Sequence, residues 1–112
     1  MTEAVRITVP VARVLAVLVA EPAADRYGLD LMRATGLPSG TLYPILARLE
    51  EAGWLQARWE DVDPAAAGRP ARRYYRLTAA GAEAGRVELA ALHAQTRPAT
   101  APRPATAHRW AR

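Results

Sequence analysis

The chain carries at its centre the stretch Ser39-Gly40-Thr41-Leu42-Tyr43-Pro44-Ile45-Leu46-Ala47-Arg48-Leu49-Glu50-Glu51-Ala52-Gly53-Trp54, which decides its fold. Apolar side chains recur in it at the spacing of one face of an α-helix, namely Leu42, Ile45, Leu46 and Leu49. The opposite face combines small residues with hydrogen-bond donors, namely Gly40, Thr41, Tyr43, Pro44, Ala47 and Arg48. A helix that meets only water normally carries long charged side chains there. This face is therefore typical of a helix that presses against a flat or grooved surface.

The residues before this stretch predict a second helix joined to it by a short turn. We expect that helix over about residues 27–35, with Leu29 and Met32 buried. Gly36 fits the position just beyond a helix C-terminus, and Ser39 suits the N-cap of the central helix. Two helices joined by three or four residues that include glycine are typical of a helix-turn-helix. An earlier helix, over about residues 10–21, precedes the pair.

The residues after the central helix predict a hairpin followed by a last helix. The apolar pattern changes to a period of two over residues 55–59, which predicts a strand. Residues 61–70 are rich in Ala, Gly, Pro and Asp and predict a loop, and residues 72–78 alternate again. Thr78 suits the N-cap of a helix over about residues 79–95. The expected class is therefore mainly α (α+β), a winged helix-turn-helix with a two-stranded wing.

Length and composition limit the architecture to one small domain. The chain has 112 residues and no cysteine, so it forms neither a disulfide nor a thiolate zinc site. It has no apolar run of about 18 residues for a membrane span and no secretory signal pattern, so we expect a cytoplasmic protein. We expect the folded domain over residues 1–95 and a disordered tail rich in Pro, Ala and Arg over residues 96–112.

The positive charge of the chain is concentrated in its second part. Residues 1–68 hold six Arg and nine acidic residues, a net charge of −3, whereas residues 69–112 hold nine Arg and two acidic residues, a net charge of +7. This clustering favours a polyanionic partner. The arginines of the tail fit a solvated segment better than a binding site.

These features together predict an interface with double-stranded DNA. We expect the outward face of the central helix to enter the major groove while arginines of the hairpin grip the backbone or enter the minor groove. The predicted contact residues are Ser39, Gly40, Thr41, Tyr43, Pro44 and Arg48 on the helix and Arg69, Arg72 and Arg73 on the hairpin. Two alternatives are a solvated helix with a polar hairpin, and an Arg48 held in a structural pair by Glu50 or Glu51.

Several strings of this sequence resemble the PadR family of transcriptional regulators. The matching strings are Tyr27-Gly28-Leu29-Asp30-Leu31, the Gly-Thr-Leu-Tyr-Pro and Arg-Leu-Glu strings within Ser39–Glu50, Gly53-Trp54, and Gly68-Arg69-Pro70-Ala71-Arg72-Arg73-Tyr74-Tyr75-Arg76-Leu77-Thr78-Ala79-Ala80-Gly81. They follow one another in order over about residues 10–92 without a large insertion.

The resemblance implies a homodimer that binds a palindromic operator, usually as a repressor, and that a small hydrophobic or aromatic effector releases. Family members dimerise largely through C-terminal helices, and here one such helix is available. The residues expected at the dimer contact are Val11, Leu15, Ala84, Val87, Ala91 and Leu92. The effector is expected between the subunits, near Trp54, Trp59 and the first and last helices.

Two other function classes compete with this one. The first is a winged helix that binds another protein without specific DNA binding. The second is an enzyme, but the two histidines, His93 and His108, lack a Ser or carboxylate partner at catalytic spacing. The sequence also lacks a phosphate-binding glycine loop and a cluster of metal ligands. We therefore expect no enzymatic activity, no cofactor and no metal.

Overall fold

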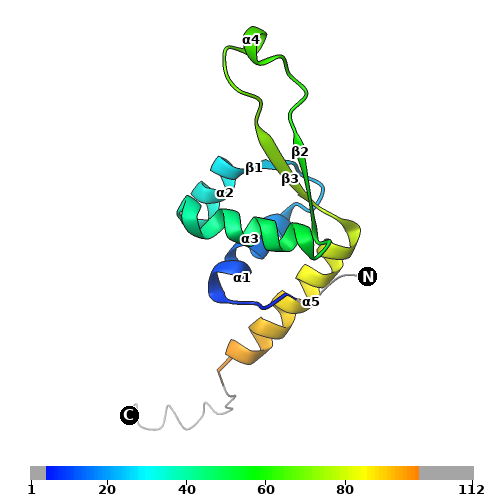
Figure 1. Cartoon of the computed structure of the whole chain (residues 1–112). Coiled ribbons are helices and arrows are strands. Elements are labelled where there is room, and N and C mark those ends of the chain that lie inside the picture. Colours follow the sequence, from blue (N-terminus) through cyan, green and yellow to red (C-terminus); the bar gives the residue numbers. More distant parts are fainter. Residues whose placement is uncertain (1–4, 99–112) are drawn as a thin grey trace, which may run out of the picture.

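The computed structural model describes residues 5–98, which form helices packed around a small three-stranded sheet (Figure 1). The elements are α1 (Val9–Ala20), β1 (Arg26–Tyr27), α2 (Gly28–Thr35), α3 (Ser39–Glu51), β2 (Leu55–Trp59), α4 (Pro64–Ala67), β3 (Arg73–Leu77) and α5 (Ala79–Thr96). The sheet has the antiparallel order β1-β3-β2. The loop between β2 and β3 extends away from the helices with α4 at its tip, and this hairpin is the wing. The winged helix-turn-helix predicted from the sequence is confirmed.

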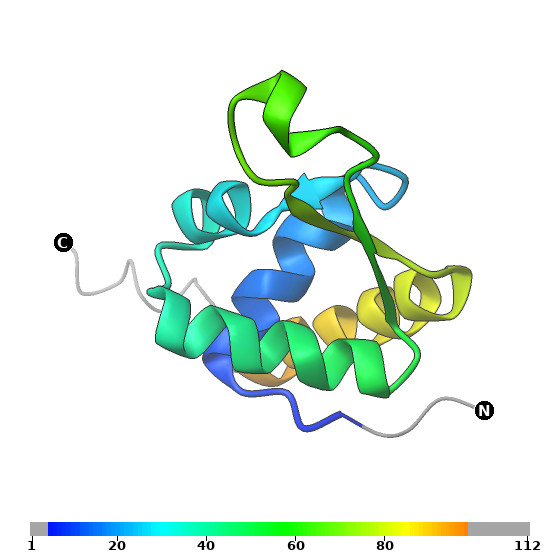
Figure 2. The ribbon, with the colours of Figure 1, turned by 45° about the horizontal axis from the view of Figure 1, so that its top comes forward.

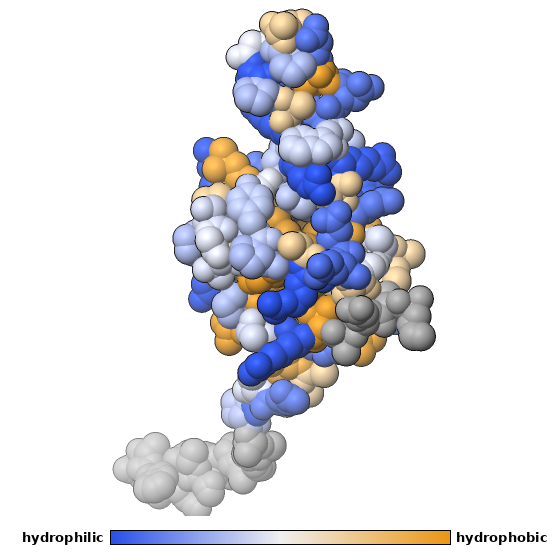
Figure 3. Space-filling view, in the orientation of Figure 1, coloured by the Kyte–Doolittle hydropathy of each residue, from blue (hydrophilic) through white to orange (hydrophobic). Residues whose placement is uncertain are grey.

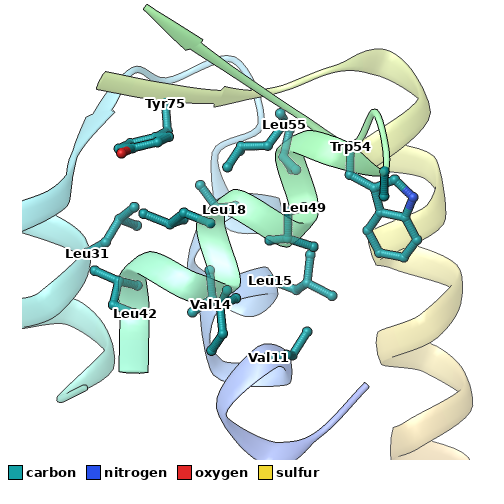
Figure 4. Packing of buried hydrophobic residues seen from close by; sticks show 14 of the residues in the cluster. Val11, Val14, Leu15, Leu18, Leu31, Leu42, Leu49, Trp54, Leu55 and Tyr75 are labelled. Atoms are coloured by element: carbon teal, nitrogen blue, oxygen red, sulfur yellow. The ribbon is translucent and has the colours of Figure 1, made fainter. Parts of the chain in front are cut away.

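One side of α3 forms the centre of the core. Leu42, Leu46 and Leu49 are at most 1% exposed and pack with apolar residues of α1, α2 and the sheet (Figure 4). Burying a leucine side chain contributes about 1.5–3 kcal/mol. The orientation of α3 about its own axis is therefore set by these leucines.

The turn between α2 and α3 is held by Thr35 and Gly36. Gly36 has a φ of 75°, which favours glycine, and its N–H donates to the carbonyl of Met32 at 2.9 Å. The buried hydroxyl of Thr35 donates to the carbonyl of Leu31 at 2.6 Å and accepts from the N–H of Leu37 at 3.2 Å. The turn thereby pairs its buried polar groups and fixes the angle between the two helices.

The start of α5 is attached to the body through Thr78. Its hydroxyl accepts from the N–H of Gly81 at 2.9 Å, which confirms the predicted N-cap, and donates to the carbonyl of Gly53 at 2.7 Å. Its own N–H donates to the carbonyl of Trp54 at 3.0 Å. Because Gly81 has no side chain, α5 approaches the backbone of Trp54 so closely that a Cβ at position 81 would overlap it.

Most predicted boundaries lie within two residues of the observed ones, and the differences have local causes. Ser39 is the first residue of α3 rather than its N-cap, because Pro38 already provides the extended residue before the helix. In the predicted loop, Asp63 caps a short helix by accepting from the N–H of Ala65 at 3.1 Å. Of the predicted tail over residues 96–112, Thr96 belongs to α5, and residues 99–112 lie outside the described part.

Replacement of Gly81 by alanine is expected to destabilise the protein by about 1–3 kcal/mol, because the added methyl group meets backbone that no rotamer change can move. Gly40→Ala is the matched control. Position 40 lies in α3 with open space around it, so this change should stabilise by about 0.5–1 kcal/mol. Urea denaturation followed by tryptophan fluorescence measures both, and equal stability of the two variants would contradict the close contact.

Candidate nucleic-acid interface

The outward face of α3 is uncovered along its length. Tyr43 is 43% exposed, Ser39, Gly40 and Pro44 are exposed, and Thr41 is half-buried. α3 crosses the front of the molecule with no other element over it (Figure 2). In the space-filling view the surface around it is mostly hydrophilic, with small apolar areas between polar ones (Figure 3). The face that the sequence predicts for a partner is thus accessible to one.

The N-terminus of α3 presents backbone donors to solvent. The N–H groups of Thr41 and Leu42 donate to the carbonyl of Pro38 at 3.0 and 2.9 Å, and no side chain of residues 5–98 caps the helix. The N–H groups of Ser39 and Gly40 precede the first bond of the helix and point out of its end. Together with the positive end of the helix dipole, such groups favour an anion such as phosphate.

Tyr43 connects the outward face of α3 with the start of α2. Its ring lies against Gly28 so closely that a Cβ at position 28 would overlap it. Leu29, expected in the core, is instead 54% exposed beside this contact, and Leu31 is the buried leucine of α2. A hollow of about 250 Å³ lies between α2, α3 and β3, lined by Tyr27, Gly28, Leu29, Tyr43, Arg72, Arg73 and Tyr75. Phenolic rings and guanidinium groups therefore gather between α3 and the wing.

Glu60 holds the base of the wing through four hydrogen bonds. It accepts two from the guanidinium of Arg69, at 2.7 and 3.1 Å, one from the hydroxyl of Tyr27 at 3.0 Å and one from the backbone N–H of Arg72 at 3.1 Å. The Arg69 bonds are the main reason that the pKa of Glu60 is lowered to about 2, and they raise the pKa of Arg69. The guanidinium expected to grip DNA from position 69 is thus occupied by a carboxylate. Neither Glu60 nor Tyr27 is among the predicted contact residues, because 33 positions separate them and no local pattern signals their contact.

The two remaining wing arginines, Arg72 and Arg73, differ in whether a carboxylate lies near the guanidinium group. The guanidinium carbon of Arg72 lies 5.4 Å from the ring centroid of Tyr27, and no carboxylate of residues 5–98 forms an ion pair with it. Arg73 lies over the Trp59 ring at 5.3 Å and 3.4 Å from a carboxylate oxygen of Glu50. Arg72 is therefore the better placed of the two to meet an added anion.

Glu50 does not hold Arg48, although the sequence offered that pairing as an alternative. Its carboxylate reaches across to Arg73 on β3 instead. Arg48 is exposed on α3, and among the described ion pairs it takes part in none. Its guanidinium remains available to a partner that approaches α3.

The two tryptophans expected beside one effector site lie apart. Trp54 is 3% exposed and packs in the core beside α5 (Figure 4), whereas Trp59 is 63% exposed on the wing. Trp54 immediately precedes β2 and Trp59 ends it, so they lie roughly 16 Å apart along the extended chain. Among residues 5–98 the buried Nε1 of Trp54 has no hydrogen-bond partner, which is rare for a buried donor.

The residues expected at a dimer contact fall into two groups. Val11 and Leu15 lie in the core of the single chain, 2% and 0% exposed, so neither offers surface to a second copy. At Leu15, α5 packs closely on α1, because Gly85 has no side chain there. The α5 residues are more accessible: Val87 is 54% exposed, Ala91 is exposed, and Ala84 and Leu92 are half-buried.

The sequence of residues 14–89 matches the model of one protein family, described as the transcriptional regulator PadR-like family. The match includes the helix-turn-helix, the wing and the first half of α5. The chain belongs to the PadR-like family. Its winged helix-turn-helix is thus the fold of a DNA-binding transcriptional regulator rather than of an enzyme. No curated protein matches this PadR-like chain.

Solved structures with the same fold include other regulators. A PadR-like transcription factor from Bacteroides fragilis is 27% identical, with a TM-score of 0.62 over 76% of this PadR-like chain and 81% of that one. A putative DNA-binding protein from Ralstonia eutropha is 25% identical, with a TM-score of 0.52 over 83% and 100% of the two chains. The PcaV transcriptional regulator from Streptomyces coelicolor, solved with its natural ligand, is 26% identical, with a TM-score of 0.54 over 83% and 64%.

Within residues 5–98 of this PadR-like chain, none of the helices is long and apolar enough to cross a membrane. The same residues hold no cluster of three or more His, Asp or Glu side chains suited to a metal ion.

The carboxyl group of Glu60 is expected to titrate near pH 2, and Arg69→Ala should raise its pKa toward the ordinary glutamate value of about 4.3. Because the folded pKa lies below the unfolded one, the network stabilises the protein above about pH 4.3, and this contribution is lost as the pH falls toward 2. Carbon-13 NMR of the carboxyl group measures the titration. Arg97→Ala is the control, and a Glu60 that titrates alike in both variants would refute the pairing.

Proposed function

We propose that this PadR-like protein represses transcription by binding a palindromic operator as a homodimer. The observation that carries the proposal is the uncovered face of α3, with its small side chains and free N-terminal amides next to the wing. An α-helix with such a face fits the major groove of B-DNA. Two copies related by a twofold axis would read half-sites about 34 Å apart on one side of the duplex.

Some of the proposed contacts position the protein on the DNA backbone, and others recognise the bases. The N–H groups of Ser39 and Gly40 would bind a backbone phosphate and set the depth of α3 in the groove. Thr41 and Tyr43 would reach base edges, and Pro44 leaves room for a close approach. Farther along α3, Arg48 would contact the backbone. On the wing, Arg72 is the main proposed contact, Arg73 is a second one beside Glu50, and Arg69 is held by Glu60.

We also propose that a small hydrophobic or aromatic effector releases the DNA. The solved complex of PcaV with its natural ligand supports ligand control in a similar fold. In this chain Trp54 is the more favourable of the two tryptophans, since its buried Nε1 is a donor without a partner in the described part of the chain and it lies beside α5. Trp59 lies too far along β2 to share that site.

Arg72→Ala is expected to weaken binding to operator DNA and to lower the slope of log affinity against log salt by about one, because each phosphate contact releases about one counterion. Tyr43→Ala should weaken operator binding more than binding to unrelated DNA, because it contacts bases. The operator is first selected from genomic fragments, with and without small aromatic compounds to test release. Affinities are then measured by fluorescence anisotropy.

Arg97→Ala is the matched control for the loss of one positive charge. Position 97 follows the C-terminal end of α5, which lies at the opposite end of the molecule from the wing (Figure 1). Its salt slope should equal that of the unchanged protein. Unchanged operator binding by both Arg72→Ala and Tyr43→Ala would refute these contacts. A protein that selects no fragment at all would favour the adapter function instead.

The surface proposed for dimerisation is the exposed side of α5 together with the N-terminal segment. Val87 is 54% exposed, and Ala91 and Leu92 border a hollow of about 250 Å³ that Val5 and Ile7 also line. Exposed apolar residues that adjoin one another in this way are typical of contact surfaces between proteins. A second copy that packs α5 against this surface would remove these side chains from water.

Val87→Glu is expected to convert the dimer into a monomer, because it places a charge in an apolar contact. Leu29→Glu is the control, since Leu29 is equally exposed, at 54%, but lies on α2. Light scattering after size-exclusion chromatography gives the molecular mass of each. If Val87→Glu elutes with the same mass as Leu29→Glu, the proposed contact is incorrect.

A further inference from the structure

Tyr27 stands at the joint between the helix-turn-helix and the wing. Its backbone belongs to β1, pairs with Tyr74 on β3 and provides the N-cap of α2, where its N–H donates to a carboxylate oxygen of Asp30 at 3.3 Å. Its ring packs edge-on against Tyr74, with the centroids 6.1 Å apart. The backbone of Tyr27 is therefore fixed by α2 and the sheet, while its hydroxyl and its ring contact Glu60 and Arg72 at the base of the wing.

Glu60 accepts the hydrogen bond from the Tyr27 hydroxyl. It also joins the two chain segments of the wing at the point where they leave the body of the protein. Its backbone N–H donates to the carbonyl of Arg72 at 2.7 Å, and its carboxylate accepts the N–H of Arg72 in return. The same carboxylate holds the guanidinium of Arg69 in a two-pronged contact and is only 15% exposed. A charged group with this many bonds loses much of its freedom to move.

Because of these contacts, Arg69 and Arg72 on the wing have different roles. Arg69 is neutralised by Glu60, whereas the guanidinium of Arg72, whose backbone bonds to Glu60, lies over the Tyr27 ring without an acidic partner among the described residues. The ring that supports Arg72 is also the one whose hydroxyl Glu60 binds. The Glu60 carboxylate thus orients the wing, pairs with Arg69 and binds the hydroxyl of the Tyr27 ring on which Arg72 lies.

We infer that Glu60 is a positioning residue for DNA recognition, which sets the angle of the wing to α3 and presents Arg72 while withholding Arg69. This inference rests on the proposed DNA-binding function. A positioning role and a purely electrostatic role of Glu60 predict opposite changes in operator affinity when its charge is removed. A carboxylate beside DNA repels phosphates, so its neutralisation alone should strengthen binding to every DNA sequence. Loss of wing positioning should instead weaken binding to the operator in particular.

The test compares Glu60→Gln with Asp61→Asn, which removes the same charge from the adjacent, exposed residue. Asp61 takes part in none of the ion pairs or side-chain hydrogen bonds of residues 5–98. Glu60→Gln should lower the ratio of operator to unrelated DNA affinity about tenfold, the effect of losing roughly one charge-assisted hydrogen bond. Asp61→Asn should leave that ratio unchanged. Tyr27→Phe, which removes only the hydroxyl, should lower it by a smaller factor.

Hydrogen exchange of the free protein gives a second measurement that needs no DNA. Amide exchange over residues 61–72 should quicken in Glu60→Gln and in Tyr27→Phe, with that of α1 and α3 unchanged, and should be normal in Asp61→Asn. A Glu60→Gln protein that changes operator and unrelated affinities by the same factor as Asp61→Asn would overturn the inference. So would unchanged wing exchange. Faster wing exchange in a protein that binds no DNA would uphold the positioning of the wing and reject the proposed function.

Discussion

The burial of one side of α3 is the constraint on which the rest of the structure depends. Leu42, Leu46 and Leu49 are removed from water almost completely, and each would lose about 1.5–3 kcal/mol if the helix turned. A helix cannot bury both faces in a domain of this size. Fixing the leucines therefore forces the small residues and Tyr43 outward, and the uncovered face of α3 is a direct result of core packing.

The number of arginines on the wing does not indicate which of them are available to a partner. Arg69, Arg73 and Arg76 each lie within ion-pair distance of a carboxylate, at 2.7, 3.4 and 2.8 Å. Exposed pairs of this kind stabilise a fold by only about 0–1 kcal/mol. Their effect here is to decide which guanidinium groups are engaged within the protein, and Arg72 is left outside the pairs.

Much of the fold follows from local patterns, and the exceptions share a physical origin. The helix period of residues 42–49, the two-residue period of β2 and the cap at Thr78 predict their elements correctly. β1 has only two residues, so it produces no alternation that a reader of the sequence would recognise. It exists because β3 offers it hydrogen bonds. The alternative in which Glu50 or Glu51 holds Arg48 does not occur among the described ion pairs, and Glu50 pairs with Arg73 of β3, which the fold brings close.

The family, the order of the helices and the composition of the outward face of α3 follow from the sequence alone, because each depends on residues within a few positions of one another. The packing of the elements determines which side chains share a surface. It buried Val11 and Leu15 in the monomer, separated Trp54 from Trp59, and brought Glu60 to Tyr27 across 33 positions. Contacts between residues this far apart depend on how elements pack, and no periodicity in a single chain encodes that packing.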